Sequence, residues 1–363
     1  MKTAIIYDRV NKWGGAERVL LALHEIFPKA PLYTSVYNPE TASWAKVFPK
    51  VIPSFLQKIP FAKTNHELLA PLMPIAFETF DFSGFDLVIS VTSEATKGII
   101  VRPPTKHICY CLTPTRYLWS HYGTYFKGGT FKGVMRPVVN YLRHWDKIAA
   151  QRPDKIIAIS TAVQKRIEKY YGRDSEIVYP PVDVDKFRVS KVSNVPKVLK
   201  AKYFLVVSRL VSYKKVDLVI KAFNKLDLPL VIVGTGRQEK KLKKMAKSNI
   251  EFVSNLTDKE LINYYRGAWA LIMVQEEDFG IVAVEAQAAG IPIIAYNKGG
   301  SFDTVVEGKT GVFFDKQSPK SLLSAIERFD KIVFNKIDLV SNAKKFSKKR
   351  FRKEFYLLID QFI

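Results

Sequence analysis

The chain of 363 residues is longer than one hydrophobic core usually serves, so its length favours two domains. Hydrophobic residues make up 47% of it, an apolar content that excludes an intrinsically disordered chain. The net charge of +23, from 57 Lys and Arg against 34 Asp and Glu, favours polyanions, anionic lipid surfaces or phosphorylated ligands as partners without choosing among them.

The apolar runs of the chain are short. None approaches the roughly 18 uncharged apolar residues that a membrane span requires, so we expect no span. The first run, residues 3–7, is interrupted by a loop and predicts a strand instead of a secretory signal. Cys109 and Cys111 stand two residues apart on another predicted strand, where an ordinary disulfide cannot form. These features favour a reducing, cytoplasmic location.

Short β-branched runs alternate with longer amphipathic stretches, which is typical of parallel sheets covered by helices. The predicted strands of the first half are residues 3–7, 32–36, 87–91, 107–111, 156–159 and 176–178. Those of the second half are residues 203–207, 230–233, 251–253, 271–274, 292–295 and 311–314. The predicted fold class is therefore α/β, with two doubly wound, Rossmann-like domains that face each other across a ligand-binding cleft.

The domain boundaries follow from composition. Residues 1–188 form the predicted N-terminal domain and residues 189–340 the C-terminal domain, joined by a polar, proline-bearing linker that runs through residues 179–183 and then 189–200. Residues 341–363 carry apolar side chains at helical spacings, so we expect a C-terminal helix that packs back across the linker.

The segment from Gln275 to Ala286 is the strongest chemical signal. A strand that ends at Val274 is followed by a turn and a helix, whose unpaired N–H groups and positive dipole end suit phosphate oxygens. Glu277 lies in the turn, where a carboxylate can accept sugar hydroxyls, and Glu285 lies about two turns later, within reach of a ribose diol. Acidic residues near a helix start also commonly complement the dipole, so the spacing alone is weak.

Cations occupy the corresponding place after another predicted strand. Arg209 follows residues 203–207 and Lys214 comes a few positions later, a pairing that can neutralise a diphosphate. Gly14 and Gly15, between the first strand and the first helix, allow close approach of backbone to phosphate, although such a pair equally suits a plain tight turn. The full G-x-G-x-x-G pattern of dinucleotide binding is missing, which disfavours an oxidoreductase.

Four motifs together resemble those of the retaining GT-B glycosyltransferases of family 4 (group 1), and the likeness covers nearly the whole chain. They are Gly14-Gly15-Ala16-Glu17, Ser208-Arg209-Leu210 with Lys214, Glu277 to Glu285, and Gly290-Ile291-Pro292 with Gly299-Gly300. Within that family, residues 110–119, 141–146 and 179–183 are similar to the mannosyltransferase-like branch of bacterial surface-polysaccharide assembly.

This resemblance implies a role for each candidate residue. It assigns the donor diphosphate to Arg209 and Lys214, the ribose to Glu285, and a second approach to the phosphates to Gly14 and Gly15 of an acceptor-side N-terminal domain. The donor sugar would contact Glu277 and the backbone of Phe279, Gly280 and Ile281, and the base would contact Ser254, Asn255 and Leu256.

One position departs from the family. Members of this branch often carry a His, which commonly contacts the donor sugar, where this chain has Leu112. His107 is five residues earlier and too distant to substitute, and an ordinary polar role near a strand start is its default interpretation. Arg116 is the better candidate for a compensating contact, with a surface ion pair as the equal alternative.

The resemblance therefore predicts transfer of a hexose, mannose from a guanosine diphosphate donor being favoured, to a glycan or lipid-linked acceptor on the cytoplasmic side of a membrane. No Asp/His cluster has metal-ligand spacing, so no metal or other cofactor is expected. Two alternatives stay open. The charge and 17 Tyr would suit a nucleic-acid-binding protein, which leaves Glu277 and Glu285 unexplained, and a nucleotide-sugar epimerase would share the fold.

Basic and aromatic residues are interleaved between residues 122 and 143, a pattern that suits a lipid interface. We expect this patch to rest on anionic lipid at the inner face of a membrane, a basic but free surface being the alternative. Its members are Tyr122, Tyr125, Phe126, Lys127, Phe131, Lys132, Arg136 and Arg143.

Overall fold

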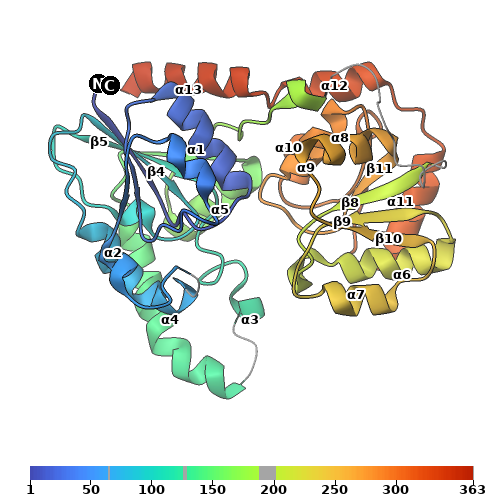
Figure 1. Cartoon of the computed structure of the whole chain (residues 1–363), viewed down its shortest axis with the longest axis horizontal. Coiled ribbons are helices and arrows are strands. Elements are labelled where there is room, and N and C mark those ends of the chain that lie inside the picture. Colours follow the sequence, from blue (N-terminus) through green and yellow to red (C-terminus); the bar gives the residue numbers. More distant parts are fainter. Residues whose placement is uncertain (64–65, 126–128, 188–201, 363) are drawn as a thin grey trace. The chain divides into compact units, whose positions relative to one another are not determined.

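The computed structural model describes residues 1–63, 66–125, 129–187 and 202–362 (Figure 1). Of the predicted linker, residues 189–200 lie outside these ranges, and residues 179–183 lie where the two units divide. The chain divides into two compact units, an N-terminal unit of Met1–Tyr179 with Arg352–Ile363 and a C-terminal unit of Pro180–Phe351. The first division falls before the predicted boundary at residue 188, because Val182 pairs with Ser347 in a β-bridge inside the C-terminal unit.

The N-terminal unit is built on a seven-stranded parallel sheet with the order β3-β2-β1-β4-β5-β6-β7. Its central strands are fully buried apolar runs, as expected of a parallel sheet covered on both faces. The strands are β1 (Thr3–Tyr7), β2 (Leu32–Thr34), β3 (Val51–Pro53), β4 (Leu87–Thr92), β5 (Lys106–Cys111), β6 (Lys155–Ala158) and β7 (Glu176–Ile177). All six predicted strands are present, and β3 is an additional strand that the sequence pattern does not predict.

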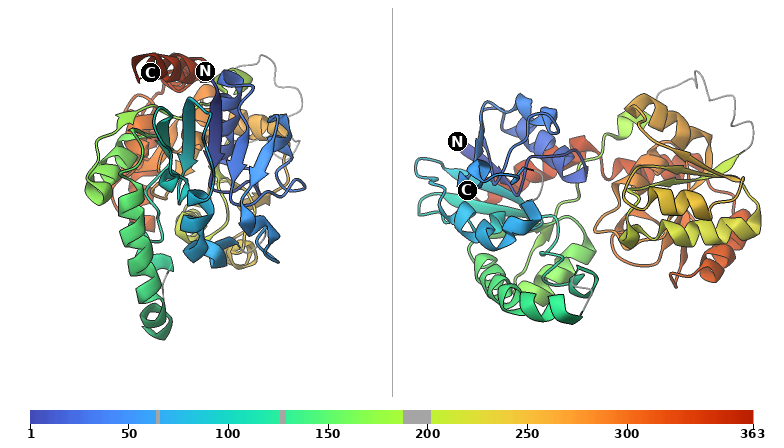
Figure 2. Two further views of the ribbon diagram at one scale, coloured as in Figure 1. Left: turned by 90° about the vertical axis from the view of Figure 1, so that its left-hand side faces the viewer. Right: turned by 60° about the horizontal axis from the view of Figure 1, so that its bottom comes forward.

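The helices of this unit connect successive parallel strands. They are α1 (Gly15–Ile26), α2 (Met73–Glu78), α3 (Tyr122–Tyr125), α4 (Gly129–Ala149) and α5 (Thr161–Tyr171), with 3-10 turns η1 (Ser43–Val47), η2 (Phe55–Lys58), η3 (His66–Leu72) and η4 (Thr96–Gly98). Figure 1 and the left view of Figure 2 show the N-terminal end of α4 extending beyond the rest of the unit. The cysteines of β5 are buried and free, in agreement with the expected absence of a disulfide between them.

The C-terminal unit has a six-stranded parallel sheet with the order β10-β9-β8-β11-β12-β13, the doubly wound order of a Rossmann fold. The strands are β8 (Tyr203–Val207), β9 (Leu230–Val233), β10 (Ile250–Val253), β11 (Ala268–Met273), β12 (Ile293–Tyr296) and β13 (Gly311–Phe314). Each matches a predicted strand within a few residues. The order places β8 at the centre, between β9 and β11.

Helices cover both faces of this second sheet (Figure 1). One face packs against apolar side chains of α6 and α11, including Phe223 and Phe329, and α8 and α9 lie on the other. The elements are α6 (Val216–Leu226), α7 (Glu239–Met245), α8 (Asp258–Gly267), α9 (Ile281–Ala288), α10 (Ser301–Thr304), α11 (Pro319–Asp330) and α12 (Lys336–Lys344), with 3-10 turns η5 (Val184–Phe187) and η6 (Ser212–Lys214).

The predicted C-terminal helix is two helices. The segment from residue 341 is divided between the end of α12 and α13 (Lys348–Phe362), and from Arg352 onward the chain belongs to the N-terminal unit. There Phe355 is fully buried with its ring centroid 6.4 Å from that of Tyr110, and Arg352 forms an ion pair with Glu25. The last helix thus completes the core of the unit in which the chain began.

Candidate functional site

The carboxyl edge of the C-terminal sheet brings the predicted cations and carboxylate together. The loop after β8 carries Arg209 and Lys214, and the loop after the adjacent strand β11 carries Glu277. Lys214 Nζ and Glu277 Oε1 form an ion pair, with side chains 12% and 16% exposed. Two residues 63 positions apart therefore form one half-buried, charged cluster.

A second side chain fixes the same carboxylate. Gln275, 4% exposed, donates from Nε2 to Glu277 Oε1 at 2.7 Å. The sequence pattern singles out the segment that contains Gln275 but gives this residue no role. Its position after the apolar run that ends at Val274 is the only sequence signal for it.

Tyr213 joins the two cations. Arg209, which is exposed, donates from Nη2 to the Tyr213 hydroxyl. The Tyr213 ring centroid lies 6.0 Å from Arg209 Cζ and 5.4 Å from Lys214 Nζ, both within reach of cation–π attraction. Sequence reasoning missed Tyr213, although it directly precedes Lys214. The ring holds both positive charges in one small region that suits a diphosphate.

Glycines allow the surrounding loops to approach closely. Gly280 precedes α9 with φ of +91°, and no side chain of the described residues caps this helix, so its first N–H groups can bind an anion. Gly299, with φ of +75°, lies against the Glu277 loop, where an added Cβ would come within 2.4 Å of the Glu277 carbonyl oxygen. Gly300 N–H donates to that oxygen at 2.8 Å.

Glu285 is more enclosed than its predicted ribose role suggests. It is 2% exposed on α9, and its Oε2 accepts the Tyr265 hydroxyl of α8 at 2.9 Å. The residues expected at the base, Ser254, Asn255 and Leu256, follow the edge strand β10, with Asn255 at φ of +56°. Ser254 and Asn255 are exposed at the same carboxyl edge of the sheet.

In the N-terminal unit, Gly14 and Gly15 connect β1 to α1, as predicted. Gly14 precedes the helix, where an added Cβ would lie 3.0 Å from Glu17 Oε2, and Gly15 is exposed. The Glu17 carboxylate accepts the Tyr7 hydroxyl at 3.0 Å, and burial raises its pKa. The two glycines thus leave the N-terminus of α1 without a side-chain cap, next to the buried carboxyl group of Glu17.

A buried carboxylate organises the neighbouring loop. Asp8, at the end of β1, is 2% exposed and accepts backbone N–H groups of Ser93, Ala95 and Thr96 at 2.6–3.1 Å. These bonds fix the loop that follows β4, and Glu94 of that loop forms an ion pair with Arg9 at 2.5 Å. The carboxyl edge of this sheet is therefore rigidly held.

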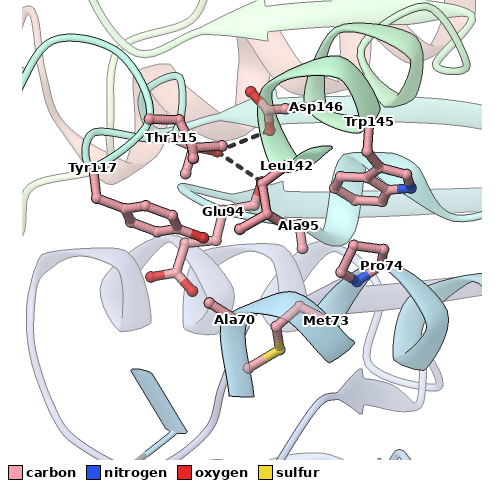
Figure 3. A pocket seen from close by; sticks show the side chains of 11 residues that line it. Ala70, Met73, Pro74, Glu94, Ala95, Thr115, Tyr117, Leu142, Trp145 and Asp146 are labelled. Carbon is pink, nitrogen blue, oxygen red and sulfur yellow. Dashed lines mark hydrogen bonds between the residues drawn. The ribbon is translucent and has the colours of Figure 1, made fainter. Parts of the chain in front are cut away.

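Asp146 forms the centre of a second buried network, part of which Figure 3 shows. Its carboxylate lies 2.5 Å from Lys97 Nζ and accepts Thr115 Oγ1 at 2.9 Å, Trp119 Nε1 at 2.7 Å and the Tyr171 hydroxyl at 2.9 Å. The network joins two of the stretches that resemble the mannosyltransferase-like branch, residues 110–119 and 141–146.

A small pocket borders this network (Figure 3). It is lined by Ala70, Met73, Pro74, Glu94, Ala95, Thr115, Tyr117, Leu118, Leu142, Trp145 and Asp146. The walls are mainly apolar, and Glu94 and Tyr117 supply polar groups on one side.

Leu112 stands where related proteins often have a His, and the environments of Leu112, Arg116 and His107 differ. Leu112 follows β5 directly, half-buried, with its N–H bonded to Thr92 O at 2.8 Å, and Arg116 is half-buried in the next turn. His107 is fully buried, contacts Ser90 Oγ through Nε2 at 2.8 Å, and burial lowers its pKa to about 3. His107 is thus a neutral, buried residue at the second position of β5, and its hydrogen bond to Ser90 gives it an ordinary structural role near the strand start.

Among the residues that the structure describes, no three His, Cys, Asp or Glu side chains are grouped as metal ligands. In the same part of the chain, no helix has both the length and the apolar character needed to cross a bilayer.

Comparison with protein families gives two matches. Residues 13–186 match "Glycosyltransferase Family 4" and residues 190–346 match "Glycosyl transferases group 1". The two matches adjoin and together leave only short stretches of the chain uncovered.

Curated relatives share part of the chain. An uncharacterized glycosyltransferase of Methanocaldococcus jannaschii is 27% identical over 57% of this chain and 58% of its own length. A GDP-mannose-dependent alpha-(1-6)-phosphatidylinositol monomannoside mannosyltransferase of Mycobacterium tuberculosis is 29% identical over 48% of this chain and 51% of its own. The chain spans about half the length of the curated relatives it matches.

Solved structures match over the whole chain. A lipopolysaccharide outer core galactosyltransferase, WaaB, has a TM-score of 0.72 at 17% identity and full coverage of both chains. HepE of Anabaena, solved in complex with UDP, has a TM-score of 0.72 at 16% identity, covering 99% of this chain and 100% of its own. These likenesses confirm the predicted α/β, GT-B fold. With both family matches and the two Rossmann-like units, the chain belongs to the group 1, family 4 glycosyltransferases.

Proposed function

We propose that this protein transfers a hexose from a nucleoside diphosphate sugar to a glycan or lipid-linked acceptor, with retention of anomeric configuration, in surface-polysaccharide assembly. The observation that carries the proposal is the cluster of Arg209, Lys214 and Glu277 at the carboxyl edge of the C-terminal sheet. Mannose from GDP-mannose is favoured because the mycobacterial relative is GDP-mannose-dependent. The UDP complex of HepE supports a nucleotide donor in general.

The proposed chemistry places its main demand on the leaving group. The bond between the anomeric carbon and the diphosphate oxygen breaks, and the acceptor oxygen forms the new bond on the same face of the sugar. The acceptor's proton passes to the departing diphosphate. Arg209, Lys214 and the N–H groups at the start of α9 would stabilise the negative charge that develops there, and such electrostatic stabilisation is commonly the main contribution to catalysis. In this scheme neither an imidazole at position 112 nor a metal ion takes part.

The donor is tested by a thermal-shift series followed by a product assay. We expect GDP-mannose to raise the melting temperature more than UDP- or ADP-sugars, since a ligand at 100 times its Kd stabilises by about 2.7 kcal/mol. NMR of the product formed from an α-configured donor should show an α linkage, and the rate should persist in excess EDTA. Activity that EDTA abolishes and magnesium or manganese restores would contradict the metal-free scheme. Donor binding with neither transfer nor hydrolysis across an acceptor panel would contradict the proposed activity.

Catalysis without the imidazole gives a prediction for two side chains. Leu112→Ala should change substrate affinity only modestly, because we propose that Leu112 forms an apolar wall beside the donor ring. Arg116→Ala should lower turnover by about tenfold if it contacts the sugar, since a hydrogen bond to a charged group contributes about 1.5–3 kcal/mol. His107→Gln is no clean control because that site is buried. Steady-state kinetics measures both variants, and unchanged kcat and KM in Arg116→Ala would remove it from the site.

We further propose that α4 rests on anionic lipid at the cytoplasmic face of a membrane. Arg136 is exposed in the first half of α4 (Gly129–Ala149). Arg143 of the predicted patch makes contacts within the protein. Its Cζ lies 4.6 Å from the centroid of the Tyr122 ring, and its Nε donates to Leu118 O at 2.7 Å. Phe126 and Lys127 lie outside the described residues, as do the side chains of Tyr125, Phe131 and Lys132.

Liposome flotation tests this surface. Arg136→Ala should weaken partitioning to anionic vesicles about fivefold, because a cation near a charged leaflet contributes about 1 kcal/mol. Lys241→Ala, an exposed cation on α7, is the control of equal charge and should have little effect. Equal partitioning of the wild type to neutral and anionic vesicles would leave the patch a free basic surface.

A further inference from the structure

Gln275 is the least exposed polar side chain of the Glu277 cluster. It is 4% exposed and begins the loop after β11, immediately beyond the buried Val274. The backbone at this point is itself held, because Gln317 Nε2 donates to Val274 O at 2.8 Å. The Gln275 side chain therefore starts from a fixed position and has little freedom to turn toward solvent.

The contacts of Glu277 are distributed unequally between its two oxygens. Lys214 and Gln275 both donate to Oε1, and no hydrogen bond to Oε2 occurs among the described residues. A carboxylate has about four acceptor sites over its two oxygens, so this arrangement leaves Oε2 available to hydroxyl groups of a ligand.

The two donors to Oε1 differ in charge. Lys214 is a cation beside Arg209 and Tyr213, so the charge of an arriving diphosphate would attract it away from Glu277. The Gln275 amide is neutral and buried, and it gains much less from a phosphate. One contact of Glu277 is therefore exchangeable on donor binding and the other is not.

We propose, on the basis of the function proposed above, that Gln275 is a positioning residue for donor-sugar recognition. It holds Glu277 in place through Oε1 when Lys214 moves to the diphosphate, and it thereby directs Oε2 to the hydroxyl groups of the sugar. Gln275 contributes to binding of the sugar part of the donor and not to binding of the nucleoside diphosphate.

Paired calorimetric titrations separate these contributions. The probes are GDP with GDP-mannose and UDP with UDP-glucose, and the pair that the wild type binds more tightly is used throughout. Gln275→Met keeps the volume and removes the N–H donor, and we expect it to weaken nucleotide-sugar binding about tenfold. Its affinity for the free diphosphate should stay within about twofold of the wild type. Gln164→Met, which removes an amide hydrogen bond to Ser175 O in the N-terminal unit, is the matched control.

The titrations distinguish failure of the Gln275 role from failure of the proposed function. Equal weakening of diphosphate and nucleotide sugar, or no weakening of either, overturns the role of Gln275. A wild type that binds none of the four probes contradicts the proposed function instead. If Gln275→Met does not fold, Gln275→Asn keeps a buried amide that is too short to reach Oε1, and the same selective loss is expected.

Discussion

Replacing Asp146 with Asn is expected to destabilise the N-terminal unit by about 3–5 kcal/mol, because it leaves a buried lysine without its counter-charge. Lys97 and Asp146 have side chains only 3% and 1% exposed. Burial alone would lower the pKa of Lys97, but the Asp146 carboxylate outweighs it, so the pKa is raised overall. The pair therefore stabilises the N-terminal unit fully at neutral pH. This contribution is lost at alkaline pH, as the pH rises past the ordinary pKa of lysine and through the raised pKa of Lys97.

Urea denaturation followed by tryptophan fluorescence measures this change, since Trp119 donates directly to Asp146. Asp217→Asn is the control, because it removes an exposed pair with Lys221 on α6 that should contribute below about 0.5 kcal/mol. The double variant Lys97→Met with Asp146→Asn should recover much of the loss, because it removes the unpaired buried charge while the Asn amide oxygen still accepts hydrogen bonds from the network. If Asp146→Asn lowers the free energy of unfolding no more than the control does, Lys97 must be stabilised by water or by another partner.

Arg209→Ala and Lys214→Ala should each weaken nucleoside diphosphate binding by about tenfold or more, because a charge-assisted hydrogen bond contributes about 1.5–3 kcal/mol. The fold should be unaffected, since Arg209 is exposed and Lys214 is the last residue of the short 3-10 turn η6, outside the sheet and its covering helices. The reasons for the loss differ between the two variants. Arg209→Ala removes one cation and its partner contact with Tyr213, whereas Lys214→Ala also leaves Glu277 facing the diphosphate without a neutralising charge.

Isothermal calorimetry with GDP and UDP measures both affinities. Lys221→Ala is the matched control, because it removes an exposed cation from the following helix. The double variant Lys214→Ala with Glu277→Gln should bind the diphosphate more tightly than Lys214→Ala alone, since the repulsive carboxylate is then neutral. Unchanged affinity in both single variants would exclude Arg209 and Lys214 from the site.

Apolar patterning along the chain was enough to locate the strands and the sheet edge that carries the chemistry. Fully buried parallel strands are continuous apolar runs, so β1, β4, β8 and β11 could be located from composition alone. The carboxyl ends of parallel strands share one edge of the sheet, and this placed Arg209, Lys214 and Glu277 near one another. The strand β3 escapes prediction because it has three residues, one of them Pro53, and therefore shows no period.

The partner of each polar side chain, in contrast, is defined only in the folded chain. Gln275 and Asp146 lie in segments that the sequence singles out, whereas Lys97 does not, but no local pattern gives any of the three its partner. Their contacts come from loops and helices that only the folded sheet brings together. The motif predicts that Glu285 binds a ribose. In the folded chain, however, α8 packs against α9, and Glu285 is enclosed beside Tyr265. Side-chain burial depends on every neighbouring element at once. The residue types and their order therefore indicate the fold and the class of ligand, whereas the contacts that orient the charges become defined only when distant segments pack together.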